Sequence, residues 1–309
     1  MEKVAYFFVD DTIWCLRDVA RQKPASIFDQ FFFKMLKKGH DEYGMTAQLN
    51  LFYRTDFFYG DDEFTLSEMP DTYKGEFQAN KDWLRLAFHA KQEFPDYPYV
   101  NATYQDVYNN FKTIEKEVER FAGPGMYADV LCTHWLPLSK EACKALVDCG
   151  IRLVSPSVGD KWEFDGDESV LPYGHAARLL QNRQPETKLY TRPTKDLRIR
   201  ASICAYNHIT SEEREKFAHK NASIEDKIGI RYRQYGGGPT LNLNTVDEIR
   251  ESIISEAGKG HEFIGVGNHE QYYYPDYFAY QSDMPEKFYT MAKTFHELGY
   301  TFITAEDFE

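Results

Sequence analysis

The sequence predicts a single α/β domain, residues 1–309, built on a largely parallel sheet. Short runs of β-branched and aromatic residues alternate with longer amphipathic segments, as in repeated strand–helix units. Several of the strand-like runs are almost wholly apolar, as expected for strands buried on both faces. With 309 residues, 42% of them hydrophobic, the chain is long enough for one large core.

The strand-like runs are spread over the whole chain. They cover residues 4–9, 47–52, 84–88, 129–132, 151–154, 200–205, 262–266 and 300–303. Amphipathic periodicity predicts helices over residues 26–38, 102–121, 139–149, 245–257 and 285–298. Thr245 and Glu248 have the spacing of a capping box, and Gly150 and Gly299 stand where a left-handed helix end is favoured.

Two stretches interrupt this alternation. Residues 56–82 and 157–197 are acidic, aromatic and rich in turn-forming residues, without a clear period. We interpret them as loop excursions over the mouth of a barrel, where insertions leave the scaffold intact. Residues 235–239 form a glycine-rich segment that lacks the Gly-Lys-Ser/Thr ending of a phosphate-binding loop. We expect a flexible connection there.

Charge and cysteine content narrow the classes of partner. A formal net charge of -13 disfavours nucleic acid and anionic membranes, which attract clustered Lys and Arg. The five cysteines form no Cys-x-x-Cys pair and suit reduced thiols in a core. No signal peptide or membrane-spanning segment is visible before the first strand. We therefore expect a cytoplasmic protein that acts on a small molecule or an oligosaccharide; the sequence does not indicate an oligomeric state.

Polar residues follow several of the predicted strands. The first strand ends in Asp10 and Asp11, which alone could equally form a turn or cap the next helix. His89, His134 and His269 also follow strand-like runs. In barrels of strand–helix units, side chains just past the strand C-termini converge on one face. The repeated coincidence favours a functional site at that end of the barrel.

A mixed set of aspartate and histidine suits one divalent ion. Zinc is the first candidate, since imidazole and carboxylate bind it and leave a position open for water. Such an ion makes bound water acidic enough to supply hydroxide near neutral pH. Hydrolysis of an amide or ester also needs a base for the water proton and an acid for the leaving group. Of two adjacent aspartates, one can hold the ion while the other takes the proton.

Four short motifs occur in a fixed order. They are the run from Phe8 to Thr12, the segment around His89, the helix–Gly150–strand passage after His134, and His269 followed by residues 298–304. Together they resemble the ordered motifs of polysaccharide deacetylases, over residues 4 to about 308. The resemblance implies a distorted, TIM-like (β/α)7 barrel and metal-assisted removal of an acyl group, usually acetyl, from an N-acylated sugar.

The resemblance also implies roles for individual residues. Asp10 matches the general base of that family, and His269 matches the general acid of its last motif. Asp11 and His89 match metal ligands. These assignments predict a centre in which two adjacent aspartates have different functions.

The chain departs from the family pattern at two points. Where the family has a second histidine four residues after the first, this sequence has Glu93, and Pro95 disfavours a continuing helix there. We therefore take His134 as the third ligand, with Glu93 as the alternative. The arginine that the family places near the position of His134 is missing. Arg54 and Arg85 are weak substitutes as partner of the base, because surface ion pairing explains them equally well.

Three functions stay open. The first is a metal-dependent deacetylase of an amino sugar or related amide; the second is a metal-dependent hydrolase of a non-sugar amide. The third is a carbohydrate-binding protein that keeps the same barrel and an aromatic-lined mouth but has lost turnover; the altered second and third motifs, at Glu93 and around His134, support it. His208 follows a predicted strand and is left undecided. We expect packed or solvated roles for the other histidines, His40, His175, His219, His261 and His296.

Overall fold

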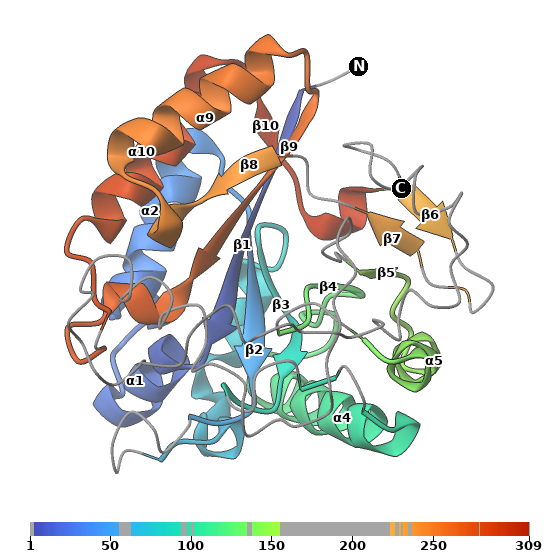
Figure 1. Ribbon diagram of the computed structural model, residues 1–309. Coiled ribbons are helices and arrows are strands. Elements are labelled where there is room, and N and C mark those ends of the chain that lie inside the picture. The colour runs from blue at the N-terminus through green and yellow to red at the C-terminus, as the bar shows by residue number, and fades with distance from the viewer. Residues whose placement is uncertain are drawn as a thin grey trace, which may run out of the picture.

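A parallel sheet flanked by helices forms the centre of the molecule (Figure 1). The computed structural model describes residues 3–55, 63–93, 98–99, 102–134, 138–154, 223–225, 229, 231–233, 237–277 and 279–308. The predicted α/β fold is confirmed in this part of the chain. The predicted strand at 200–205, the excursion at 157–197, and His175, His208 and His219 lie outside the described residues.

The strands fall into two sheets. The larger has the order β3-β2-β1-β9-β8, with β10 also paired to β1, and the smaller has the order β4-β5-β7-β6. All described pairs are parallel except β6 with β7. The strands are β1 (Val4–Thr12), β2 (Ala47–Phe52), β3 (Leu84–Ala90), β4 (Val130–Leu131), β5 (Leu153–Val154), β6 (Ser223–Glu225), β7 (Arg231–Arg233), β8 (Gly237–Thr240), β9 (Phe263–His269) and β10 (Thr301–Phe302).

Main-chain hydrogen bonds link Leu86 of β3 to the segment that leads into β4. Its amide donates to the carbonyl of Met126 at 3.1 Å, and its carbonyl accepts from the amide of Ala128 at 2.7 Å. The strands therefore continue from β3 towards β4 as one curved wall, in keeping with the predicted distorted barrel.

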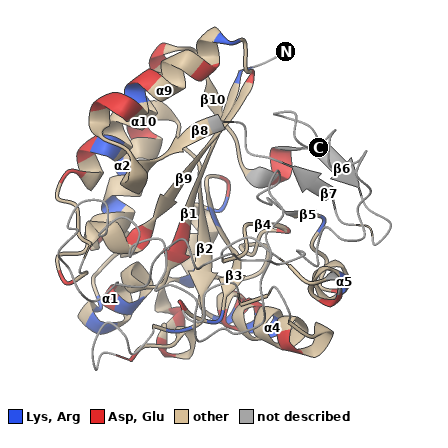
Figure 2. Cartoon of the chain, viewed as in Figure 1, with Lys and Arg blue, Asp and Glu red and all other residues tan. Residues whose placement is uncertain are grey.

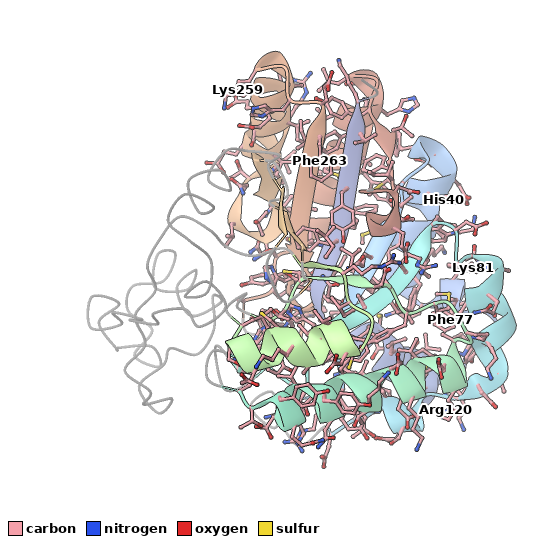
Figure 3. The ribbon with its side chains drawn as sticks, turned by 90° about the vertical axis from the view of Figure 1, so that its right-hand side faces the viewer. His40, Phe77, Lys81, Arg120, Lys259 and Phe263 are labelled. Carbon is pink, nitrogen blue, oxygen red and sulfur yellow. The ribbon has the colours of Figure 1, made fainter. Side chains whose placement is uncertain are left out.

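Helices cover the outside of this wall. Figure 1 shows α2, α9 and α10 on one side, and Figure 3 shows α4 and α5 lying alongside each other on another. Figure 2 shows that charged residues gather on the helices and that the strands are largely uncharged. The helices are α1 (Trp14–Gln22), α2 (Phe31–Tyr43), α3 (Lys74–Ala79), α4 (Tyr104–Phe121), α5 (Lys140–Asp148), α9 (Val246–Gly258) and α10 (Met284–Glu297). None of these described helices is long and apolar enough to cross a membrane.

Short 3-10 turns complete the described part. They are η1 (Ile27–Asp29), η3 (Leu66–Glu68), η4 (Asp71–Tyr73), η8 (Leu241–Leu243), η9 (Glu270–Tyr273) and η10 (Ala305–Phe308). Arg120 of α4 ties one of them down by donating to the carbonyls of Leu66, at 2.9 Å, and Met69, at 2.7 Å. Arg120 and Phe77 of α3 lie at the same end of α4 (Figure 3).

Both faces of β1 are buried, as the apolar strand pattern predicts. Ala5, Phe7 and Val9 belong to the main core beneath the helices. Tyr6 belongs to a second cluster, with Val130 of β4 among its members. Alternate residues of a strand point to opposite faces, so the second cluster lies on the inner side of the curved sheet.

Several helix ends follow the sequence signals. Thr245 and Glu248 form the predicted capping box at the start of α9. Gly150 and Gly299 have φ values of 90° and 75°, as expected for left-handed residues after α5 and α10. The predicted helix at 26–38 is wrong at its start, because η1 comes first and α2 begins only at Phe31. The side chain of Gln30 accepts from the amides of Phe32 and Phe33 and so sets this boundary.

The prediction of a flexible connection at 235–239 is wrong for its second half. Residues Gly237–Thr240 form β8, which pairs in parallel with β9. A Cβ atom on Gly238 would lie 2.1 Å from the carbonyl oxygen of Gly265, so only glycine permits this close approach of two strands. Glycines that allow close contact between two backbones look like turn residues in the sequence. For this reason the sequence predicted a flexible connection where β8 lies.

Candidate metal centre

A β-bulge at the end of β1 places two consecutive aspartates at the centre. Neighbouring residues of a regular strand point to opposite faces, so Asp10 and Asp11 could not otherwise both point inward. Opposite β2, Val9 pairs with Leu49 but Thr12 pairs with Leu51, which leaves one extra residue on β1. Asp11 takes a left-handed φ of 60° in this bulge, an uncommon value for a residue other than glycine.

His89 occupies a second bulge on β3. Phe88 pairs with Leu51 of β2 and Ala90 pairs with Phe52, so His89 is the extra residue between them. Bulges of this kind re-aim a side chain at the rim of a sheet. Both Asp11 and His89 therefore point into the centre because the local register of the sheet is broken.

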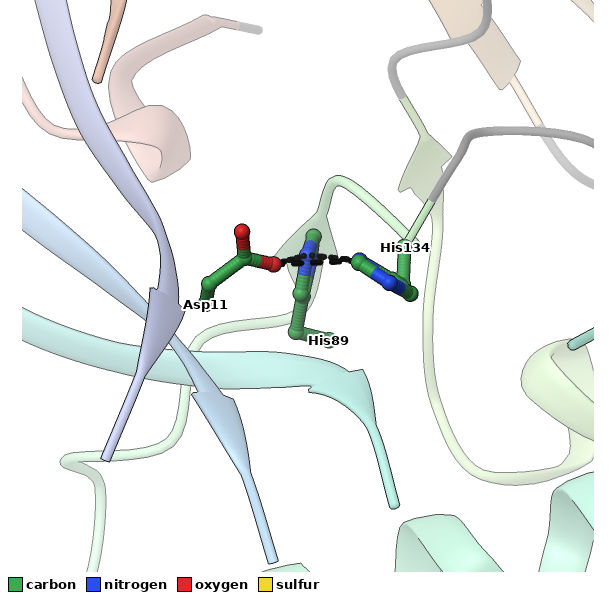
Figure 4. Close-up of side chains that lie close together, drawn as sticks. All are labelled: Asp11, His89 and His134. Carbon is green, nitrogen blue, oxygen red and sulfur yellow. Dashed lines mark hydrogen bonds and ion pairs between the residues drawn. The ribbon is translucent and has the colours of Figure 1, made fainter. Parts of the chain in front are cut away.

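Asp11, His89 and His134 bring three donor atoms together (Figure 4). Asp11 Oδ1 lies 3.0 Å from His89 Nε2 and 3.0 Å from His134 Nδ1, and the two nitrogens are 3.2 Å apart. All three side chains are buried, with 0 to 2% of their surface exposed. Zinc holds nitrogen and oxygen ligands at about 2.0–2.2 Å, which sets neighbouring ligand atoms of a tetrahedron about 3.3–3.6 Å apart. The three donors lie a few tenths of an ångström closer together than this, near the spacing of ligands on one ion.

Main-chain carbonyls fix the orientation of both imidazoles. His89 Nδ1 donates to the carbonyl of Cys132 at 2.5 Å, and His134 Nε2 donates to the carbonyl of Glu93 at 2.9 Å. A carbonyl only accepts, so these nitrogens hold the protons of the neutral rings. The lone pairs of His89 Nε2 and His134 Nδ1 then face Asp11 and each other. Histidine ligands of metal ions are commonly oriented in this way.

The electrostatics of the centre favour positive charge. Burial raises the pKa of Asp11, but the neighbouring His134 and His89 outweigh it and hold that pKa well below its ordinary value. Burial lowers the pKa of His89, but the carboxylates of Asp10 and Asp11 reverse the direction and raise it. For His134 burial dominates and lowers the pKa. An ionised Asp11 therefore faces imidazole nitrogens in a buried site, an arrangement that a divalent cation would neutralise.

Asp10 lies beside the three donors and has a different environment. Its Oδ1 accepts from Asn50 Nδ2 at 2.6 Å, and its Oδ2 lies 3.8 Å from the Cys132 thiol. Asn50 in turn accepts from Gln48 at 2.8 Å. Burial raises the pKa of Asp10 from 3.8 to about 6. Asp10 is thus a hydrogen-bonded carboxylate next to the group of donors and is not one of them.

Sequence reasoning missed Asn50 as the partner of Asp10. Arg54 bonds instead to Gln92, and Arg85 pairs with Glu306. The signal was present in β2, where polar residues at 48 and 50 alternate with apolar ones in a wholly buried strand. Such alternation marks a polar row on one face of the strand.

Glu93 lies behind His134, on the side away from Asp11. Its carbonyl accepts from His134 Nε2, while its carboxylate lies 3.9 Å from the same nitrogen. Gln271 holds the other carboxylate oxygen at 2.9 Å. Of the two alternatives for the third donor, the geometry groups His134 with Asp11 and His89, and it places Glu93 as a support for His134.

His269 reaches the same end of the sheet from β9. In the parallel register of β1 and β9 it lies directly opposite Asp10. Its Nδ1 bonds to Asn242 Oδ1 at 2.8 Å, and it remains half-buried. The structure therefore brings all five predicted site residues to the C-terminal ends of the strands, with Asp10 and His269 adjacent to the three donors. Asn242 was not predicted.

Glu270, the residue after His269, caps helix α1. Its carboxylate accepts from the amides of Ile13, Trp14 and Cys15 at 2.7, 2.8 and 2.6 Å. Neither Asp10 nor Asp11 caps this helix, which resolves the alternative left open by the sequence. The same glutamate fixes the end of β9 to the end of β1, so it sets His269 relative to the two aspartates.

The remaining described histidines have structural surroundings, as predicted. His40 stacks on Trp83 with ring centroids 4.5 Å apart. His261 pairs with Glu256 at 2.6 Å. His296 is exposed on α10, with its ring centroid 5.8 Å from that of Tyr43. All three lie away from the C-terminal ends of the strands.

Comparison with known proteins gives matches of fold only. No family model and no curated protein matches the chain. Among solved structures, a 4-alpha-glucanotransferase from Thermococcus litoralis is 12% identical with a TM-score of 0.53. The match covers 100% of this chain and 40% of that enzyme, so this chain spans less than half of its length. The identity is low, and what the two proteins share is the fold.

Two further solved structures match over almost the whole of this chain. A family 4 acetyl xylan esterase from Clostridium thermocellum, in complex with a cobalt ion, is 10% identical with a TM-score of 0.44, over 99% of this chain and 90% of that one. The carbohydrate deacetylase Agd3 is 8% identical with a TM-score of 0.46, over 99% and 53% of the two chains.

Proposed function

We propose that this protein is a metal-dependent hydrolase that removes an acyl group, most simply acetyl, from an amino sugar or a related amide. The observation that supports this most directly is the convergence of three donor atoms from Asp11, His89 and His134. Both histidines are held by main-chain carbonyls in the tautomer that turns a lone pair inward. Three convergent lone pairs in a buried site would repel one another without a cation between them.

Zinc is the ion we propose for this set. Two imidazoles and one carboxylate are ligands that zinc accepts, and three protein ligands leave a position open, as in catalytic sites. A bound ion would polarise a substrate carbonyl and lower the pKa of a water molecule.

Asp10 and His269 supply the proton transfers in this proposal. The oxygen of water bonds to the carbonyl carbon while its proton passes to Asp10. The carbon–nitrogen bond then breaks as His269 gives a proton to the amine nitrogen, and the products are a carboxylic acid and a free amine. The positions of Asp10 and His269 opposite each other on β1 and β9 support this division.

The choice of an amino sugar rests on the sequence motifs. The order of Asp10-Asp11, His89 and His269 along the chain resembles that of polysaccharide deacetylases, whose substrates are N-acylated sugars. A non-sugar amide would need the same hydrolytic residues, so substrate tests must separate the two.

The first experiment measures metal. Elemental mass spectrometry of protein purified without chelator should find about one zinc ion per chain. His89→Ala should lose most of this ion because one of three ligands is removed. His261→Ala is the matched control, since His261 also bonds to a carboxylate but lies away from the centre. Full retention of metal in His89→Ala, or its absence from the unaltered protein, would contradict the proposal.

The second experiment measures hydrolysis. Acetate release is compared between an oligosaccharide of N-acetylglucosamine and a small aliphatic acetamide. Faster release from the sugar supports the proposal, and release from the acetamide alone would indicate a non-sugar amidohydrolase. Stoichiometric metal without release from either substrate would favour a carbohydrate-binding protein.

A further inference from the structure

His269 is held by a neutral side chain that is completely buried. Its Nδ1 lies 2.8 Å from Oδ1 of Asn242, and Asn242 has 0% of its surface exposed. An amide oxygen only accepts, so this contact places a proton on Nδ1 of the imidazole. The other ring nitrogen, Nε2, then has the lone pair in the neutral ring.

Asn242 is itself fixed by a buried polar chain from α10. The side chain of Gln281 donates to the main-chain carbonyl of Asn242 at 2.9 Å. The ammonium group of Lys287 donates to Gln281 Oε1 at 2.5 Å, and Lys287 is only 1% exposed. Asp283 lies 3.2 Å from the same ammonium group. Burying a lysine costs free energy unless its ammonium group is paired. The bonds of Lys287 to Asp283 and Gln281 meet this need, and Gln281 in turn holds the turn that contains Asn242.

We infer that Asn242 is a positioning residue that keeps His269 in one tautomer, with its proton on Nδ1, so that Nε2 alone exchanges protons with a substrate. This inference rests on the proposed role of His269 as general acid. When the protonated imidazole gives up a proton from Nε2, the proton on Nδ1 stays bound to Asn242. The ring returns to its starting form when Nε2 takes a proton from solvent.

A neutral partner has a specific effect on this histidine. A carboxylate at position 242 would favour the imidazolium ion by its charge, whereas an amide oxygen orients the ring without adding charge. Asn242 therefore selects which nitrogen is protonated and leaves the charge of the ring to the other groups of the centre.

Nitrogen-15 NMR of histidine-labelled protein tests the inference directly. Spectra are recorded near pH 8.5, about two units above the ordinary histidine pKa of about 6.5. The chain has nine histidines, and the signals lost in His269→Gln identify His269. In the unaltered protein Nδ1 should be protonated and Nε2 bare. In Asn242→Ala the two nitrogens should show averaged shifts displaced towards the tautomer with the proton on Nε2, because no acceptor then holds the proton on Nδ1. A proton on Nε2 in the unaltered protein, or an unchanged tautomer in Asn242→Ala, would overturn the inference.

Two variants separate this role from a general loss of structure. Asn242→Asp retains an acceptor oxygen and should restore the tautomer with the proton on Nδ1. Asn244→Ala is the matched control, because Asn244 bonds to the Thr240 carbonyl in the same turn and leaves His269 untouched. It should keep the original spectrum, and a tautomer change in Asn244→Ala equal to that in Asn242→Ala would refute a specific role.

Kinetics add a second readout where a substrate is turned over. Asn242→Ala should lower kcat by about tenfold or more and leave KM within about twofold, since proton donation is impaired and binding is not. Because the NMR result needs no turnover, a protein without hydrolytic activity would still reveal whether Asn242 sets the tautomer. Failure of the proposed function and failure of this inference are therefore distinguishable.

Discussion

Asp10 and Asp11 are adjacent in sequence and have different hydrogen-bond partners, although both lie near His89, on opposite nitrogens of its ring. Asp11 Oδ1 meets the two imidazole nitrogens at 3.0 Å, whereas Asp10 Oδ1 accepts a hydrogen bond from the amide of Asn50. The β-bulge at this end of β1 makes this difference possible, because its extra residue breaks the alternation of side chains between the two faces of the strand. Each carboxylate can therefore be altered separately.

Asp10→Asn should preserve the metal and abolish most of the activity. An amide has nearly the shape of the carboxylate and leaves Asp11, His89 and His134 untouched, so ion content should stay at about one per chain. Loss of a positioned general base typically reduces the rate about a hundredfold or more. Metal analysis and acetate release on the same preparation measure both quantities. Asp11→Asn is the comparison, and it should lose the ion; equal metal loss in the two variants would refute the separate roles.

The sequence was informative about charged site residues and poor at finding their amide partners. Asp10, Asp11, His89, His134 and His269 were found because each follows a strand, and parallel strands end on one face. Asn50 and Asn242 were missed because an amide has no distinctive spacing in sequence. Their role depends on which residue lies opposite in the fold.

At the scale of elements, α1 depends on a distant residue for its first turn. The residue before the helix, Ile13, provides no side-chain cap, and Glu270 accepts the first amides instead from about 255 positions away in sequence. Tyr274 also donates to this carboxylate, at 3.1 Å. Helix prediction relies on local caps, so α1 was not expected from the sequence.

Glu270→Gln should destabilise the protein by about 2–4 kcal/mol, because an amide nitrogen would face buried backbone donors in place of an acceptor. The free energy of unfolding in urea, monitored by circular dichroism, measures this change. Glu286→Gln is a suitable control, since Glu286 lies in the first turn of α10 and is exposed. It should have a much smaller effect. Similar midpoints for Glu270→Gln and the unaltered protein would show that the cap contributes little.

For the whole molecule, the three proposed ligands join segments that are far apart in the chain. Asp11 and His89 are separated by 78 positions, and His89 and His134 by 45. An ion that binds all three would stabilise the folded chain and have little affinity for the unfolded one. The centre therefore links Asp11 of β1 and His89 of β3 to His134, which follows β4.

Removing the metal should lower global stability. At a free zinc concentration one hundred times the dissociation constant, binding adds about 2.7 kcal/mol to the free energy of unfolding. We expect EDTA to shift the urea midpoint downward by a corresponding amount and added zinc to restore it. In His89→Ala, EDTA should have almost no effect, and an equal shift in both proteins would place the ion elsewhere.

The fold class was predictable because its signals are repeated along the chain. Every strand that follows an amphipathic segment adds to the same conclusion, so errors at single boundaries did not matter. The strand β8 escaped prediction because Gly238 is needed for contact with Gly265 and leaves no apolar pattern. Local chemistry identifies most elements; α1, whose cap is distant in sequence, and β8, which depends on close contact between strands, were not predicted.

The carbonyl groups that orient His89 and His134 have a consequence for how this centre can evolve. Both acceptors belong to the main chain, at Cys132 and Glu93, and every amino acid has that carbonyl. Substitutions at positions 93 and 132 can therefore accumulate without loss of histidine orientation, provided that the path of the backbone is kept. Selection at positions 93 and 132 would act on the shape of the backbone, and the amino acids at these two positions would diverge between relatives. Related centres would then be recognised by superposition of their ligands sooner than by alignment of their sequences.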